Sequence, residues 1–241
     1  MRNPLRVASL VLFMMTLSVM EIRAQVADNS AAINNSSENV SSQTASSSPY
    51  RLKKGDNELG FWSGGSFSAT TMFGGLKEDE ARGRGLFLAA LRYGRTLAAT
   101  KNTALQYTLD AIPIALAVGN LVGNVQPAAN GSFATTARRE TTYGAGVTPL
   151  GLQADFRNSH HIKPFLHVNG GLLIFTKPVP LPDSGKFSYV GEAGTGVRIF
   201  TSDRRAVTLG FRFHHISNGN RSGSNRGLNE FVIYAGFSIF K

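Results

Sequence analysis

The chain has 241 residues, a formal net charge of +10 and no cysteine, which excludes disulfides and thiolate chemistry. Its 26 glycines and 16 phenylalanines, with only 17% charged residues, favour a sheet with tight bends over a helical enzyme. The net positive charge suits an anionic partner, either nucleic acid or a phosphate-bearing membrane surface. No recognisable nucleic-acid-binding motif accompanies the charge, so we expect no nucleic acid partner.

The first 24 residues predict a signal peptide for secretion. Arg2 and Arg6 supply its basic start, residues 7–20 form an apolar run, and cleavage is expected after Ala24. The apolar run is shorter than the roughly 20 residues that a membrane-spanning helix needs. Residues 25–56 are rich in Ser, Asn and Ala and cannot bury enough apolar surface to fold, so we predict a disordered linker there.

From Asn57 to Lys241 the chain consists of alternating apolar and polar runs, separated by polar or Gly-rich breaks. Eight is the smallest strand number of an outer-membrane barrel, and each strand needs only about 9–11 residues. We therefore predict an all-β fold over 57–241, an eight-stranded antiparallel transmembrane β-barrel. Alternation is weaker in the fourth run, where Pro149 is expected to mark a bulge or a change of phase. The predicted runs are 57–70, 84–100, 103–119, 141–156, 162–177, 187–201, 206–218 and 228–241.

Within these runs, charged residues of both signs share one face, where they could pair inside a narrow barrel. The alternative is a soluble barrel or sandwich with its apolar face inward. It is disfavoured because a water-facing surface would then carry few charges. The residues expected inside are Arg92, Asp110, Asp155, Glu192, Arg198 and Arg212.

The breaks between runs alternate in length, which predicts long external loops and short periplasmic turns in the outer membrane. Breaks near 71–83, 120–140, 178–186 and 219–227 are long, and the other breaks are short. Basic side chains in the long loops could bind the phosphates of lipid A, since guanidinium groups bind phosphate bidentately; an ordinary solvated surface is the alternative. These residues are Arg138, Arg139, Lys177, Lys186, Arg221 and Arg226.

A candidate nucleophile and base end the seventh run. His215 and Ser217 lie two residues apart, so in a strand both side chains share the apolar face of Phe211 and Phe213. A histidine can take the proton of a serine hydroxyl when a third group holds its tautomer. This arrangement on an apolar face suits a site that contacts lipid.

The third group could come from the start of the last run, across the hairpin. Asn229 is separated from the apolar residues Phe231 and Ile233 by an even number of positions, so it should share their outward face. Glu230 should point inward unless a bulge turns it. Oxyanion donors could come from the side chains of Asn218 and Asn225. The backbone N–H groups of Gly219 and Asn220 are further candidates.

These residues resemble the lipid A 3-O-deacylase (PagL) family. The resemblance covers about the last thirty residues: His215-Ile-Ser217-Asn218, then Asn225-x-Gly227-Leu228 and a closing apolar strand. It implies a small outer-membrane barrel with a Ser-His-Glu site on its lipid-facing surface, hydrolysing the 3-O-linked acyl ester of lipid A without a metal. By this resemblance Ser217 is the nucleophile, His215 is the base, and the two asparagines shape the oxyanion site.

The sequence departs from the family at the acid. Counting from Asn225, the family's acid falls on Asn229, with Glu230 one residue later. Three outcomes stay open: Asn229 orients His215 as a neutral partner, a bulge delivers Glu230, or the site is inactive. The competing functional classes are a non-enzymatic structural or adhesive barrel with a degenerate site, and a soluble lipid carrier.

The remaining motifs indicate structure rather than chemistry. His160, His161 and His167 have no convincing metal-ligand spacing, so we expect no metal site and no cofactor. Paired glycines at 64–65, 74–75 and 170–171 lack the helix and spacing of a phosphate cradle and predict bends. The sequence leaves both a monomer and a homodimer open.

Overall fold

The computed structural model of the protein describes residues 50–127, 133–223 and 225–241. Among these residues, no helix is long and apolar enough to cross a membrane. The predicted signal peptide and most of the predicted linker lie outside the described residues. The elements are β1 (Asn57–Gly65), β2 (Ala69–Thr70), α2 (Glu78–Ala81), β3 (Gly85–Ala99), β4 (Thr103–Pro127), β5 (Phe133–Phe156), β6 (Ile162–Phe175), β7 (Phe187–Ser202), β8 (Arg205–Ser217) and β9 (Leu228–Phe240).

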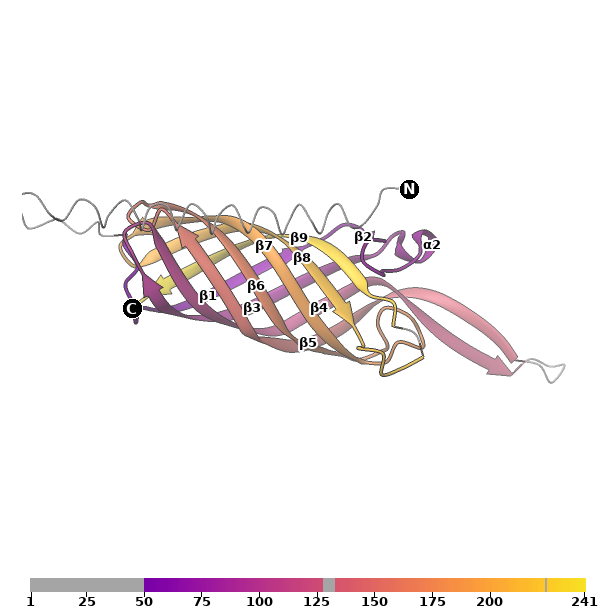
Figure 1. The fold of residues 1–241 in the computed structure, drawn as a ribbon. Helices are drawn as coiled ribbons and strands as arrows, with labels where there is room; N and C mark the ends of the chain where they lie inside the picture. The colour runs from indigo at the N-terminus through magenta and orange to yellow at the C-terminus, as the bar shows by residue number, and fades with distance from the viewer. Residues whose placement is uncertain (1–49, 128–132, 224) are drawn as a thin grey trace, which may run out of the picture. The chain divides into compact units, whose positions relative to one another are not determined.

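Eight long strands form a closed antiparallel barrel. Each of β3 to β9 pairs with its neighbour in sequence, β1 pairs with β3, and β1 also pairs with β9 to close the ring. Figure 1 shows the tilted strands and the two-residue β2 beside the start of β9. Closure leaves no sheet edge in the hydrocarbon, where each unpaired backbone group would cost several kcal/mol. The eight-stranded barrel predicted from the sequence is confirmed.

The pleat of the strands places apolar side chains outside and charged ones inside. On β9, for example, Phe231, Ile233 and Phe237 are exposed, while Glu230 and Ser238 are buried. All six charged residues expected inside are at most 5% exposed. The soluble alternative with an inward apolar face is therefore wrong.

The inward charges pair across the barrel. Arg92 binds Asp110 with two hydrogen bonds of 2.7 Å. Arg198 lies 2.9 Å from Glu58 and 3.2 Å from Asp155. The Arg92 pair joins two neighbouring strands, whereas the Arg198 contacts join strands that are far apart in the sequence. Both compensate charges that could not remain buried alone.

A second group of inward charges lies on β7 and β8. Arg212 bonds Glu192 at 2.9 Å and packs against the rings of Trp62 and Tyr234, whose centroids are 4.0 and 4.1 Å from its guanidinium carbon. His214 also contacts Glu192, with Nδ1 2.6 Å from Oε1. The strand that carries the candidate site is thus fixed from inside the barrel.

An apolar cluster fills the barrel interior beside the long loops. Ile216 and Leu228, which flank the candidate site on β8 and β9, are 0% and 1% exposed and belong to this cluster. Leu76, Val179 and Leu181 from the loops complete it. The interior is therefore packed, as expected for a barrel of eight strands.

The N-terminal boundary differs from the prediction. Residues 50–56, expected in the disordered linker, pack on the end of the barrel with the short turns. Leu52 is 2% exposed, and its backbone N–H and C=O both bond the side chain of Asn158. One buried leucine and a buried amide order a segment whose composition alone predicts disorder.

Two of the predicted runs have different bounds. The run at 57–70 is interrupted after Gly65, and only Ala69 and Thr70 pair again, with the start of β9. The break at 120–140 is largely a hairpin, since β4 and β5 pair with each other as far as Pro127 and Phe133. This hairpin extends past the barrel in Figure 1. The bulge expected at Pro149 is confirmed, since the registers of β5 shift there on both sides.

The interior network generates a stability prediction. Replacing Arg198 by Met leaves Glu58 and Asp155 buried without their cation, which should reduce the free energy of unfolding by about 3–5 kcal/mol. Guanidinium unfolding in detergent micelles, followed by fluorescence of the single tryptophan Trp62, measures the change. The control Arg82→Met, at an exposed loop position, should change it by no more than about 0.5 kcal/mol. Equal effects of the two variants would contradict a stabilising role of the interior pairs.

Candidate functional site

The end of β8 carries the candidate nucleophile and base on the outside of the barrel. His215 and Ser217 are half-buried and alternate with Ile216, which is fully buried inside. Across the ladder, His215 lies opposite Gly191 of β7 and Ser217 opposite Tyr189. The two side chains therefore lie on the outer face of the barrel, next to the long loops.

Asn229 of β9 lies directly opposite His215 and contacts its ring. The Nδ1 atom of His215 is 2.5 Å from Oδ1 of Asn229. The amide Nδ2 of Asn229 donates to the carbonyl oxygen of Met72, so its Oδ1 faces the histidine. The Nδ1–H of His215 then donates to Asn229, and Nε2 is left as the basic nitrogen.

Gly227 provides the space that the imidazole occupies. A Cβ atom at Gly227 would lie 2.5 Å from Cε1 and 3.0 Å from Nδ1 of His215. Since Ile216 pairs with Leu228, the ring leans toward the ladder position of Ser217. Within the described residues, no hydrogen bond joins Ser217 Oγ to His215; such bonds often tighten only when substrate binds.

A strap formed by residues 69–76 covers Asn229 from outside. Thr70 of β2 pairs with Asn229, and the Gly227 N–H donates to the carbonyl of Gly74 at 3.3 Å. A Cβ atom at Gly75 would lie 2.7 Å from Nδ2 of Asn229, so the strap comes close only because this residue is glycine. As a result Asn229 is 0% exposed although it lies on the outward face.

An ion pair ties the strap region to the loop before β9. Arg226 contacts Glu80 of α2, and the Lys77 N–H donates to the same carboxylate at 2.9 Å. Partial burial opposes ionisation of Glu80, but these two donors outweigh it and lower the pKa of the carboxyl. The contact holds α2, which follows the strap, beside the loop that precedes Asn229.

Glu230 points into the barrel and does not reach His215. Its Oε2 accepts a hydrogen bond of 2.6 Å from Ser66 Oγ, and its ladder partner is His214, the inward histidine. No bulge interrupts the β8–β9 ladder at this position. Of the two candidates for a third group, the structure brings Asn229 to the histidine.

The candidate oxyanion residues are separated. Asn218 turns inward and donates from Nδ2 to Ser184 O at 2.8 Å and to Ser222 Oγ at 2.6 Å. Its Oδ1 accepts from the Asn220 N–H, so both groups contribute to the loop. Asn225 is exposed, and Gly219 follows Ser217 closely with a φ of 62°.

Aromatic rings continue the outer surface away from the site. The ring of Phe73 in the strap lies 5.3 Å from that of Phe213, which is 5.5 Å from Phe231. Phe211 stacks on Phe231 at 5.4 Å. These four rings form an outer aromatic cluster on β8, β9 and the strap, on the side of His215 away from the loop end.

Several of the loop cations already have protein partners. Lys177 and Arg138 contact Glu140, at 2.5 and 3.2 Å. Arg139 donates to backbone carbonyls, and Arg221 bonds Tyr189 Oη at 3.2 Å. The cations therefore form a structured rim around the loops.

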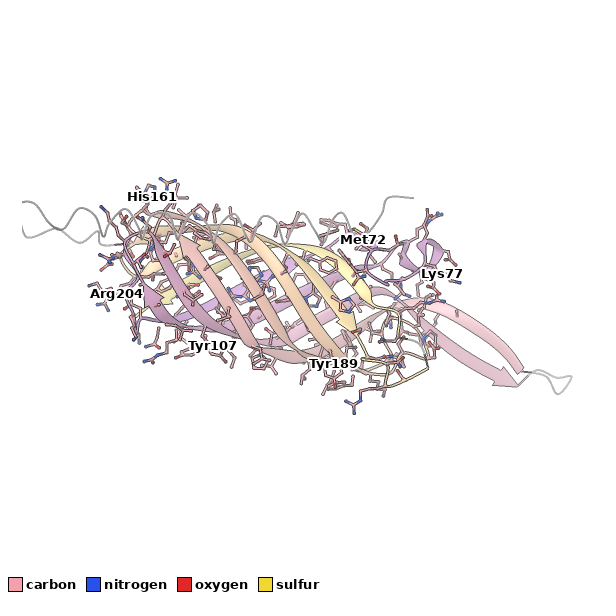
Figure 2. All side chains as sticks on the ribbon, viewed as in Figure 1. Met72, Lys77, Tyr107, His161, Tyr189 and Arg204 are labelled. Carbon is pink, nitrogen blue, oxygen red and sulfur yellow. The ribbon has the colours of Figure 1, made fainter. Side chains whose placement is uncertain are left out.

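The three histidines at positions 160, 161 and 167 lie away from the site. His160 and His161 are exposed in a short turn at the opposite end of the barrel, where Figure 2 labels His161. His167 is 3% exposed inside the barrel. In the part of the chain that the structure describes, no group of His, Asp or Glu side chains could hold a metal ion.

Sequence reasoning missed the strap. Met72 contributes a backbone carbonyl, which carries no residue-specific signal, and Phe73 lies in a stretch expected to be an ordinary loop. The glycine pair at 74–75 was the available signal, since a glycine pair also permits a close backbone approach.

Comparisons with known proteins agree with the fold and identify the family. The lipid A 3-O-deacylase (PagL) family model matches residues 91–238, more than half of the chain. Among curated proteins none matches the sequence. The crystal structure of the outer membrane enzyme PagL is similar, with a TM-score of 0.53 and 13% identity, over 74% of this chain and 97% of that one. The crystal structure of Neisserial surface protein A is also similar, with a TM-score of 0.45 and 13% identity, over 77% of this chain and 97% of the other.

The protein is thus an outer-membrane β-barrel, and the chain belongs to the lipid A 3-O-deacylase (PagL) family.

Proposed function

We propose that the protein hydrolyses the 3-O-linked acyl ester of lipid A in the outer leaflet by a serine-histidine mechanism. The observation that carries the proposal is the position of His215 and Ser217 on the outward face of β8, with Asn229 against Nδ1 of the histidine. An ester substrate embedded in the leaflet could reach these side chains directly. Membership of the deacylase family supports the same substrate class.

In this mechanism Ser217 Oγ attacks the ester carbonyl carbon while its proton passes to Nε2 of His215. The oxyanion that forms needs a donor, and the backbone N–H of Gly219 suits this role because the Asn218 side chain serves the loop. Collapse of the tetrahedral intermediate releases the 3-hydroxyl of the sugar, which takes the proton from His215. Water then attacks the acyl-enzyme, again with His215 as base, and frees the fatty acid.

Asn229 takes the place of the family's acid, and the strap explains why an amide fits there. The amide can accept from His215 Nδ1–H and donate to Met72 O at the same time. A carboxylate could accept from the histidine, but it would turn a second acceptor toward the Met72 carbonyl. The neutral partner orients the ring without the charge that would stabilise an imidazolium.

The acyl chain would lie along the outside of β8 and β9, over the outer aromatic cluster. Phe73, Phe213 and Phe231 offer a continuous apolar surface beside the reactive groups. The phosphates of lipid A would meet the cations of the loop rim, such as Lys186, which is exposed. Chain and headgroup would then bind on opposite sides of Ser217.

Removing the nucleophile tests the proposal. Ser217→Ala should lower deacylation by about 10⁴-fold or more, since the remaining groups cannot replace the attacking hydroxyl. Mass spectrometry of lipid A from cells expressing each form measures the loss of the 3-O-linked chain. Unchanged acylation with the unaltered protein would favour the non-enzymatic barrel. Deacylation that persists in Ser217→Ala, with the barrel intact, would refute the mechanism.

A pair of substitutions distinguishes the two candidates for the third group. Asn229→Ala should lower kcat by about 10²-fold, because the histidine loses the acceptor that holds its tautomer. Glu230→Gln should keep kcat within a few-fold, because that side chain bonds Ser66 inside the barrel. Turnover of purified lipid A in detergent micelles is the measurement. A larger loss from Glu230→Gln than from Asn229→Ala would assign the supporting role to Glu230.

The space over Gly227 gives a third test. Gly227→Ala should reduce kcat more than it raises KM, since the new methyl group displaces the imidazole while the aromatic surface stays intact. The matched control is Gly170→Ala on β6, where the added methyl meets its nearest atoms at 3.9 Å. Equal activity of the two variants would mean that the His215 imidazole does not act from its position beside Gly227.

A further inference from the structure

The end of the barrel opposite the candidate site carries a concentration of positive charge. The segments 50–56, 100–102, 157–161 and 202–205 hold seven Lys and Arg residues and two acidic ones, Asp56 and Asp203. We name the seven cations the cationic collar. Four of them, Lys101, Arg157, Arg204 and Arg205, lie exposed in the short turns or at the start of β8.

The collar cations lack the partners that loop cations have. None of the seven forms an ion pair with a carboxylate in the part of the chain that the structure describes, whereas Arg138, Lys177 and Arg226 at the loop end each do. In Figure 2 Arg204 lies at one end of the barrel, and Met72 and Lys77 lie at the other. The end with the short turns, which faces the periplasm, thus carries seven cations without a carboxylate partner among the described residues.

The segment before β1 supplies the other three cations from an anchored backbone. Arg51, Lys53 and Lys54 line a hollow of about 280 Å³ together with Leu52 and Ala99. Burial of Leu52 and its two bonds to Asn158 anchor this backbone, so the cations are held at the barrel rim. A phosphate group entering the hollow would meet several positive side chains at once.

The position of the collar relative to the apolar surface identifies a partner. Leu97, Leu105 and Ile162 are exposed on the outer wall directly beside the turns. Long cationic side chains at such a boundary lay their stems on the apolar surface and reach the headgroup layer. The charges occur in turns all round the barrel, which suits a leaflet that encircles it rather than a single protein docked on one side.

We propose that the cationic collar binds the phosphate groups of anionic phospholipids in the periplasmic leaflet. The contacts select acidic headgroups and fix the depth of the barrel in the membrane. The proposal does not rest on ester hydrolysis, because the collar and Ser217 lie at opposite ends of the barrel.

The full-length protein in nanodiscs of phosphatidylcholine with a minor fraction of phosphatidylglycerol tests the proposal. Native mass spectrometry counts the phosphatidylglycerol molecules that remain bound after release. Arg204→Glu/Arg205→Glu should weaken their retention by at least about tenfold, since each cation near a membrane surface contributes about fivefold. The control Lys77→Glu/Arg82→Glu carries the same charge change at the loop end and should retain the lipid as the unaltered protein does.

Three results would overturn the proposal. Equal retention in both double variants would show that the collar has no special role. Equal loss of phosphatidylcholine and phosphatidylglycerol from the collar variant would show that charge does not select the lipid. Displacement of phosphatidylglycerol by an excess of inorganic phosphate would point to a soluble anion as the ligand. Turnover of purified lipid A in detergent micelles, measured for the same variants, reports separately on the site at Ser217.

Discussion

The closed backbone ladder is the constraint on which the rest of this protein depends. Pairing of β1 with β9 satisfies every strand edge, so the barrel can lie in hydrocarbon without unpaired peptide groups. Closure also fixes which way each side chain points, because alternate residues must face either the lipid or a narrow interior. The outward position of His215 and Ser217, the proposed base and nucleophile, is a direct result of this geometry.

The interior makes that outer site rigid. Inward residues alternate with the site residues: His214 bonds Glu192 and Ile216 packs in the apolar cluster. On β9, Leu228 packs in the same apolar cluster beside Asn229. Displacing His215 would therefore require movement of a strand that is anchored by buried charge pairs and packed aliphatic side chains.

The strap explains how a neutral amide is held against the ring of His215. The Met72 carbonyl fixes the amide of Asn229, and Gly75 and Gly227 give the strap and the imidazole their space. The resulting histidine is oriented but lacks a charged partner. In the proposed mechanism, therefore, precise placement of the base takes the place of part of the electrostatic stabilisation that a carboxylate would supply.

Much of this molecule could be predicted from the sequence, and the part that could not has a common cause. Alternation in the runs was sufficient for the barrel, for the inward position of Arg198 and Arg212, and for the outward face of His215 and Ser217, because the period of a strand is local. The role of the strap, the order of residues 50–56 and the extension of β4 and β5 into a hairpin depend on contacts between distant segments.

Parity made Asn229 the nearer candidate, but a bulge would have exchanged it with Glu230, and only the assembled ladder decided between them. The sequence by itself therefore determined the barrel and the direction of its side chains, and the tertiary structure decided which side chains meet. The physical reason is that strand direction follows from neighbouring residues, whereas contact requires the closure of the chain.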